Sequence, residues 1–268
     1  MGARSSTPTG PAAAPASPSA CPPEPPEPPR MRRYLIVDDN RDFAENLAEI
    51  LRDGGDEVAI AENGQEALAL ARKTRFDALL TDMRMPLMGG AELVHELRRI
   101  DPGAAAMVIT AHVADDALEA ARREGLLAVL PKPVAVPRIL DLLAAARRDG
   151  LVAVVEDDSR MSDNLCEALR GRGFAAVTAA SVTETERLGP VEPFCALVDL
   201  RVPGGADGDA LRRLRERFPG LPVIVVTGTH EVPPVPHQGY FTKPFDTAEL
   251  LSAVERLHRE RGQTVVPE

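Results

Sequence analysis

Residues 33–40 read RYLIVDDN and residues 150–157 read GLVAVVED, two short apolar runs that each end in a pair of acids. Such a run between polar residues is typical of a strand that is buried on both faces of a sheet. Helical spacing follows the first run, with Phe43, Leu47, Ile50 and Leu51 on one face and Gly54-Gly55 at the end. The sequence therefore predicts a strand followed by a helix, and the same unit begins again near residue 151.

Strand-like and helix-like segments alternate through the first half of the chain. Expected strands are Tyr34–Val37, Val58–Ala61, Ala78–Thr81, Ala106–Ile109 and Ala128–Leu130, and expected later helices are Gln65–Lys73, Glu92–Ile100, Asp115–Glu124 and Pro137–Arg148. Alternation of this kind predicts a parallel sheet with helices on both faces and right-handed crossovers.

Landmarks of the first half recur in the second at a nearly constant offset. The offset is 118 for Leu47 with Leu165 and for Leu51 with Leu169, 117 for Asp82 with Asp199 and for Thr110 with Thr227, and 111 for Lys132 with Lys243. So regular a spacing indicates a duplicated domain. The predicted fold class is α/β, with two doubly wound (βα)5 domains, each built on a parallel five-stranded sheet.

The expected boundaries are a Pro/Ala-rich tail over 1–31, a first domain over 32–148, a second over 150–261 and a tail over 262–268. The first tail has too little to bury and is expected to be disordered. Only 16 residues separate Thr227 from Lys243, against 22 between Thr110 and Lys132, and the shorter span contains VPPVP at 232–236. Because adjacent prolines forbid a regular helix, the fourth helix of the second domain is expected to be shortened or absent.

Charge and composition argue against several classes of partner. The net charge of −10 disfavours DNA and RNA, which need clustered positive charge. No apolar stretch reaches 18 residues and no secretory leader is visible, so a cytoplasmic protein without a membrane partner is expected. Cys21, Cys166 and Cys195 are too few and too scattered for a disulfide framework or a metal cage.

Polar residues follow the ends of the expected strands. Ligands of a doubly wound sheet bind outside the carboxyl ends of its strands. In the first domain these ends carry Asp38, Asp39, Asp82, Thr110 and Lys132. The second domain supplies Glu156, Asp157, Asp199, Thr227 and Lys243 in the same order.

This residue set fits phosphoryl transfer to an aspartate. Three carboxylates at one edge repel each other unless a cation neutralises them, and ligation by oxygen alone favours Mg²⁺ or Mn²⁺. Asp82 and Asp199 can then attack a phosphoryl group, while the hydroxyl and the ammonium neutralise charge on its oxygens. The chain has only three lysines, and two of them, Lys132 and Lys243, occupy Lys-Pro pairs, where a compact charge is expected to matter.

These motifs resemble the bacterial two-component response regulators, here with two receiver domains in tandem. The likeness rests on Val37-Asp38-Asp39, Asp82-Met83-Arg84-Met85-Pro86, Thr110-Ala111 and Lys132-Pro133, and on their second copies Val155-Glu156-Asp157, Asp199-Leu200-Arg201-Val202-Pro203, Thr227-Gly228 and Lys243-Pro244. The resemblance implies a flavodoxin-like fold with strand order 2-1-3-4-5, dependence on Mg²⁺, and a phosphohistidine donor on a sensor kinase or histidine phosphotransfer protein. It also implies cis Lys-Pro bonds, and metal ligation by the backbone carbonyls of Arg84 and Arg201.

Some positions depart from the family pattern or allow a second interpretation. Receivers of this family usually carry a switch aromatic three residues before the lysine, which is Tyr240 in the second domain but Val129 in the first. His95-Glu96-Leu97-Arg98 superficially resembles the phosphoacceptor box of histidine kinases, but it fits the third helix as a solvated segment. Gly89-Gly90 and Gly204-Gly205 are expected to serve loop geometry through positive φ.

The functional hypothesis is phosphorelay signalling by an acceptor protein rather than a turnover enzyme. Asp82, and with it Asp199, is expected to take the phosphoryl group, and output is expected to pass through contacts with an unidentified downstream protein. Two alternatives remain at this stage: a receiver-like scaffold that works without phosphorylation, and a phosphatase of the haloacid dehalogenase type. The second is disfavoured because Asp38 is followed by Asp39 and Asn40 rather than by an Asp-x-Asp pattern.

Overall fold

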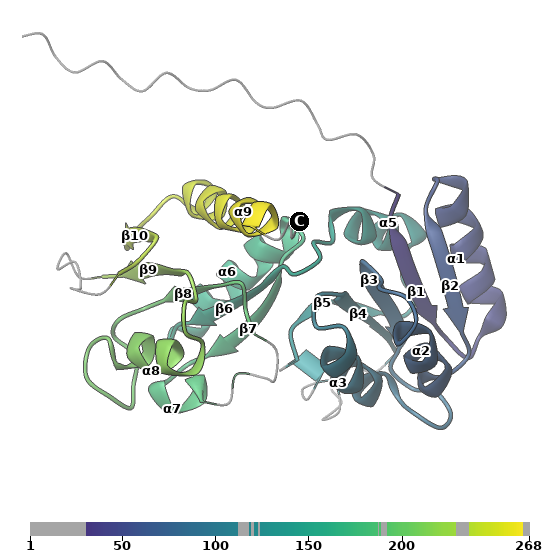
Figure 1. The fold of residues 1–268 in the computed structure, drawn as a ribbon, viewed down its shortest axis with the longest axis horizontal. Coiled ribbons are helices and arrows are strands. Elements are labelled where there is room, and N and C mark those ends of the chain that lie inside the picture. The colour runs from purple at the N-terminus through teal and green to yellow at the C-terminus, as the bar shows by residue number, and fades with distance from the viewer. Residues whose placement is uncertain are drawn as a thin grey trace, which may run out of the picture. The chain divides into compact units, whose positions relative to one another are not determined.

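The computed structural model describes residues 31–111, 118, 121–122, 124–186, 188, 192–228 and 236–264. Residues 1–30 of the expected tail over 1–31, most of the expected helix over 115–124 and the proline-rich residues 232–235 lie outside these ranges. Within the described ranges the chain folds into two five-stranded sheets with helices on their faces (Figure 1).

The first sheet is parallel throughout and has the strand order β2-β1-β3-β4-β5. Its strands are β1 (Arg33–Val37), β2 (Glu57–Ala61), β3 (Ala78–Asp82), β4 (Ala105–Thr110) and β5 (Leu126–Pro131). The central strands β1, β3 and β4 are buried along almost their whole length. That burial explains why each reads as a continuous apolar run rather than an alternating one.

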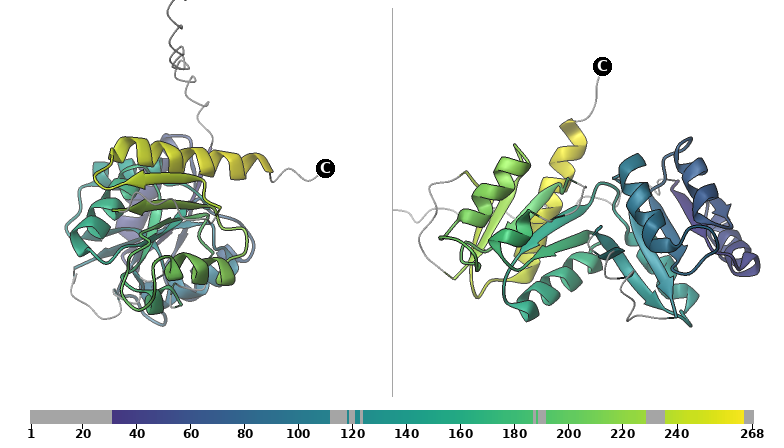
Figure 2. Two further views of the ribbon diagram at one scale, coloured as in Figure 1. Left: turned by 90° about the vertical axis from the view of Figure 1, so that its left-hand side faces the viewer. Right: turned by 90° about the horizontal axis from the view of Figure 1, so that it is seen from below.

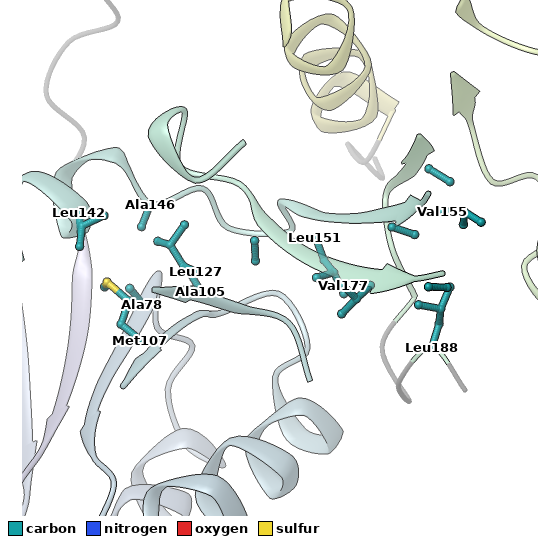
Figure 3. Packing of buried hydrophobic residues seen from close by; sticks show 14 of the residues in the cluster. Ala78, Ala105, Met107, Leu127, Leu142, Ala146, Leu151, Val155, Val177 and Leu188 are labelled. Atoms are coloured by element: carbon teal, nitrogen blue, oxygen red, sulfur yellow. The ribbon is translucent and has the colours of Figure 1, made fainter. Parts of the chain in front are cut away.

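Helices cover both faces of this sheet. They are α1 (Arg41–Asp53), α2 (Gly64–Ala71), α3 (Gly90–Ile100) and α5 (Val136–Ala145). Successive strand residues point to opposite faces, so Ile36 joins the buried cluster of Leu47 in α1 and Leu142 in α5, whereas Val37 joins that of Leu93 in α3. Figure 3 shows Leu142 among other members of the first of these clusters.

Helix α1 forms where the sequence predicts it. The side chain of Asn40 caps its first turn by accepting a hydrogen bond from the backbone N–H of Phe43, and Gly55 adopts a φ of +93° just after its end. Its buried stripe consists of Ala44, Leu47, Ala48 and Leu51. Ile50, which the spacing placed on the inward face, lies at the border of this stripe and is 43% exposed.

The second sheet repeats the first. Its order is β7-β6-β8-β9-β10, which is again 2-1-3-4-5 when its strands are counted from β6, and all of its pairs are parallel. Its strands are β6 (Leu151–Val155), β7 (Ala175–Ala179), β8 (Cys195–Val198), β9 (Val223–Thr227) and β10 (Gly239–Thr242). The predicted flavodoxin-like order is therefore confirmed.

The second sheet is also covered on both faces. Its helices are α6 (Ser159–Gly171), α7 (Val182–Thr185), α8 (Asp209–Arg217) and α9 (Thr247–Thr264). Val154 shares a buried cluster with α6 and α9, whereas Val155 shares one with α7 and α8. Figure 2 shows α9 and α8 on opposite sides of the sheet. Cys166 and Cys195 are buried free thiols in this domain, and burial raises the pKa of both.

A short connection, residues 146–150, joins the two sheets. The expected helix over 137–148 in fact ends at Ala145, because the backbone N–H of Arg147 donates to the carbonyl of Gly173 rather than to its own helix. The backbone N–H of Asp149 donates to Gly103 O at 2.8 Å. The connection is thus hydrogen-bonded at two of its residues.

No helix within the described ranges is both long enough and apolar enough to cross a membrane.

Candidate functional site

The first acidic pocket lies where β1 and β3 end. The two strands are paired neighbours, with Val37 opposite Thr81, so Asp38 and Asp39 after β1 come next to Asp82, the last residue of β3. Carboxylate oxygens of these three acids lie within 4.8 Å of one another. Asp38 is buried, Asp82 is partly buried and Asp39 is exposed, so the cluster opens to solvent on one side.

Lys132 enters this pocket from the end of β5. Its backbone N–H donates to Thr110 O at 2.8 Å, and its Nζ lies 2.6 Å from Asp82 Oδ2 and 3.5 Å from Asp38 Oδ2. The Lys132–Pro133 bond is cis, as the family resemblance implied. The structure thus brings together the carboxylates and the ammonium that the sequence predicted would meet.

Backbone donors hold two of these carboxylates in place. Asp38 Oδ1 accepts a hydrogen bond from the backbone N–H of Asn40 at 2.9 Å, and Asp82 Oδ1 accepts one from Met83 at 2.6 Å. In both acids the second oxygen, Oδ2, is the one nearest Lys132.

Electrostatics in the first pocket favour a further cation. Burial raises the pKa of Asp38, although the amide of Asn40 and the charge of Lys132 act to lower it. Burial alone would lower the pKa of Lys132, but hydrogen bonds to Asp82 and Asp38 and their charges outweigh this effect and raise it. Three carboxylates face one ammonium here, so a divalent cation would balance the charge.

The second pocket repeats this arrangement at the ends of β6, β8 and β10. Carboxylate oxygens of Glu156, Asp157 and Asp199 lie within 4.8 Å of one another. Lys243 Nζ lies 2.6 Å from Glu156 Oε2 and 2.7 Å from Asp199 Oδ2, and the Lys243–Pro244 bond is cis. Burial raises the pKa of Glu156 against the lowering effect of Lys243.

Comparison with known proteins identifies the family. The model of the response regulator receiver domain matches residues 34–144 and, a second time, residues 152–255. This chain belongs to the response regulator receiver family. Receiver domains are signalling domains, not classical turnover enzymes, and the chain carries two of them in tandem.

Curated relatives match this chain over part of their own length. The transcriptional regulatory protein PrrA of Mycobacterium leprae is 32% identical over 181 residues, which cover 68% of this chain and 66% of PrrA. The transcriptional regulatory protein ZraR of Klebsiella oxytoca is 36% identical over 100 residues, which cover 37% of this chain and 23% of ZraR. This chain therefore spans less than two thirds of the length of these relatives.

A solved structure also resembles part of this chain. It is a response regulator from Burkholderia pseudomallei, described with a phosphorylated aspartic acid, a calcium ion and citrate. It is 32% identical to this chain, covers 42% of this chain and 66% of its own, and has a TM-score of 0.39.

Each receiver also contains a buried threonine at the end of its fourth strand. Thr110 and Thr227 are the last residues of β4 and β9, and both are almost fully buried. Within the described part of the chain, Thr227 Oγ1 has no hydrogen-bond partner. Because a buried hydroxyl without a partner is costly, this atom is suited to donate to an oxygen of an incoming group.

The remaining predicted positions occupy loops and edge strands. Arg84 and Arg201 are exposed in the loops after β3 and β8, and the backbone N–H of Arg201 donates to Asp199 Oδ1 at 3.0 Å. Tyr240 lies in β10 opposite Val225 and is partly buried, with its ring centroid 6.0 Å from that of His237. Val129 occupies the matching position in β5 and is also partly buried.

Sequence reasoning missed a neighbour of the first lysine. Phe43, in the first turn of α1, has its ring centroid 6.0 Å from Lys132 Nζ. The matching residue of the second receiver is Met161, which cannot make the same aromatic contact. The sequence does show an aromatic residue soon after the acidic pair. However, the helical spacing of Phe43 with Leu47 favoured a position in the core rather than beside the lysine.

Gly90 supports the first site by close packing. Of the four glycines expected to adopt positive φ, only Gly204 does so, at +95°. Gly90 instead begins α3 against the loop after β3, where an added Cβ would lie 2.3 Å from the backbone oxygen of Asp82. Glycine is therefore needed at position 90 because two backbone segments approach closely there, and not because the residue adopts a positive φ.

Gly90→Ala is therefore expected to destabilise the first receiver by about 1–3 kcal/mol, the usual cost of forcing atoms into a packed site. It should also displace Asp82 and slow labelling of that residue. Thermal unfolding followed by circular dichroism checks the first effect. Gly171→Ala is the control, because a Cβ at Gly171 in α6 meets nothing within 4 Å. Equal stability of the two variants would show that the backbone at Asp82 and Met83 shifts to admit the extra methyl group at little cost.

Proposed function

We propose that this chain is a phosphorelay protein whose two receivers accept phosphoryl groups on Asp82 and Asp199. The proposed donor is a phosphohistidine of a sensor kinase or of a histidine phosphotransfer protein. Membership of the receiver family supports phosphorelay signalling in general. The observation that carries the finer assignment is that, in both receivers, a lysine Nζ lies within 2.7 Å of the proposed acceptor carboxylate.

Both acidic pockets have the donor set for Mg²⁺ or Mn²⁺. The proposed ligands in the first receiver are Asp38, Asp39, Asp82 and the carbonyl of Arg84, and in the second Glu156, Asp157, Asp199 and the carbonyl of Arg201. All of these donors are oxygens, which hard divalent cations prefer. The bound cation would neutralise negative charge on the carboxylates and on the phosphoryl oxygens.

The protein's own groups have defined roles in the proposed transfer. A carboxylate oxygen of Asp82 bonds to phosphorus as the bond from phosphorus to the donor imidazole nitrogen breaks, and the electron pair of that bond stays on the nitrogen. Lys132 then moves from Asp82 Oδ2 to an oxygen of the phosphoryl group, and Thr110 donates to another. Asp199, Lys243 and Thr227 take the same roles in the second receiver.

Labelling with a small acyl phosphate in the presence of MgCl₂ tests this assignment. Asp82→Asn and Asp199→Asn should each remove one labelled site, located by mass spectrometry of the digested protein, and the double variant should take no label. Asp42→Asn, which changes an exposed acid of α1, is the control. If labelling is the same in both single variants as in the wild type, neither aspartate is the acceptor and the proposed assignment fails.

We also propose that output passes through protein contacts. Tyr240 is the candidate switch residue in the second receiver, because it is partly buried on edge strand β10, three residues before Lys243. Val129 cannot supply an aromatic signal in the first receiver, so the two domains are expected to report phosphorylation differently.

A further inference from the structure

The two receivers hold their lysines differently. Lys132 Nζ makes one short contact, at 2.6 Å with Asp82 Oδ2, while Asp38 Oδ2 is 3.5 Å away, at the limit of a hydrogen bond. Lys243 Nζ makes two short contacts, at 2.6 Å with Glu156 Oε2 and 2.7 Å with Asp199 Oδ2. The second lysine therefore bridges two carboxylates, whereas the first is bound closely to one.

The cause is a single methylene group. Asp38 and Glu156 occupy matching positions directly after the first strand of their sheets. Each also accepts a hydrogen bond from the backbone N–H two residues later, at 2.9 Å from Asn40 and at 3.3 Å from Asp158. One carboxylate oxygen of each side chain is therefore fixed by the same kind of backbone hydrogen bond. Because glutamate is one methylene longer, its second oxygen, Oε2, reaches hydrogen-bonding distance of Lys243.

The bridged set is also the more buried one. The side chains of Glu156, Asp199 and Lys243 are 2%, 8% and 22% exposed. Their counterparts Asp38, Asp82 and Lys132 are 3%, 13% and 34% exposed. Hydrogen bonds between charged groups are short and strong, and they gain strength where water is excluded.

A divalent cation has to compete with this bridge. It draws on the same carboxylates that Lys243 bridges, and it repels the ammonium that lies between them. In the first pocket Asp38 Oδ2 is only weakly bound by Lys132, at 3.5 Å. A cation that binds there therefore breaks one short lysine–carboxylate hydrogen bond rather than two.

We propose that Glu156 makes the second receiver the weaker cation site, so that the two receivers load at different concentrations of the divalent cation. The inference rests on the proposed function, because it takes both acidic triads as cation sites. At low cation concentration the first receiver is then the one prepared for phosphorylation, and the second joins only when the concentration rises. The two receivers, although they share one fold, thereby respond to two different concentrations of the divalent cation.

Binding of Mn²⁺ to the full chain, with free Mn²⁺ measured by electron paramagnetic resonance, tests the proposal without phosphoryl transfer. The wild type should show two sites of unequal affinity. Glu156→Asp should tighten the weaker site by about tenfold, equivalent to one charge-assisted hydrogen bond. The reciprocal Asp38→Glu should weaken the tighter site by about as much, and it keeps the test open if Glu156→Asp does not fold.

Glu167→Asp makes the same chemical change on the exposed side of α6 and should leave both constants unaltered. Two equal sites in the wild type would overturn the proposal, and so would a folded Glu156→Asp variant whose weaker constant is unchanged. If neither receiver binds Mn²⁺, the proposed function fails as well. The two failures are thus distinguishable.

Discussion

Lys132→Ala is expected to slow formation of the aspartyl phosphate in the first receiver by about 100- to 1000-fold, the usual effect of removing one charge-stabilising donor. Lys132 is the single cation placed 2.6 Å from Asp82 within the described residues of this pocket. Without it, Asp82 keeps its nucleophilic oxygen, but the phosphoryl oxygens lose the ammonium that would balance their charge. The rate of labelling by a small acyl phosphate, measured in an Asp199→Asn background, isolates the first receiver.

Two further variants show what kind of charge is needed. Lys132→Arg should not restore the rate, because a planar guanidinium cannot replace the compact ammonium beside Asp82. Lys73→Ala, which removes an exposed lysine after α2, should label at the wild-type rate. A Lys132→Ala rate close to that of Lys73→Ala would mean that Lys132 holds the resting pocket together and takes no part in transfer.

Arg98→Ala should cost the first receiver about 3–5 kcal/mol of unfolding free energy, because it leaves several buried carbonyl groups without a donor, each at a cost of about 1–3 kcal/mol. Arg98 is only 5% exposed, and its guanidinium donates to the backbone carbonyls of Pro102, Ala104, Glu124 and Gly125. Burial lowers its pKa to about 10, so it is still protonated at neutral pH. Its removal leaves four carbonyl groups in two loops without this donor.

Chemical denaturation followed by circular dichroism measures this cost. The adjacent Arg99→Ala is the matched control, because Arg99 is exposed and forms a surface ion pair with Glu96 at 3.4 Å. Arg98→Lys should recover only part of the loss, since an ammonium cannot reach four acceptors in the fork geometry of arginine. Similar stability of the alanine variants at 98 and 99 would contradict the proposed bracing role.

Arg98 also shows where sequence reasoning stops. It follows the stripe of Leu93, Val94 and Leu97 in α3 and therefore stands on the inward face by spacing, yet its charge favoured a solvated position. The groups that bind Arg98 and allow its burial are backbone carbonyls of two loops. Every residue has such a carbonyl, so no sequence pattern indicates this contact. By contrast, the apolar runs ending in acids predicted both sheets and the meeting of their carboxylates, because strand order alone brings those ends together.

Distances within the pockets could not be predicted in the same way. The sequence showed aspartate at 38 and glutamate at 156, but whether the extra methylene turns toward the lysine depends on the hydrogen bonds that fix the rest of the side chain. The end of α5 is a similar case. Its alanines and arginines suit a helix up to Arg148, but Gly173, distant in sequence, accepts the hydrogen bond that ends it.

The placement of the two tyrosines allows each receiver to be followed separately by fluorescence in solution. The chain has no tryptophan and two tyrosines, of which Tyr34 is buried in β1 and Tyr240 lies in β10. Tyrosine fluorescence of the folded protein therefore comes from one ring in each domain. Tyr34→Phe would leave a spectrum that reports the second receiver alone, and Tyr240→Phe one that reports the first, without any attached dye.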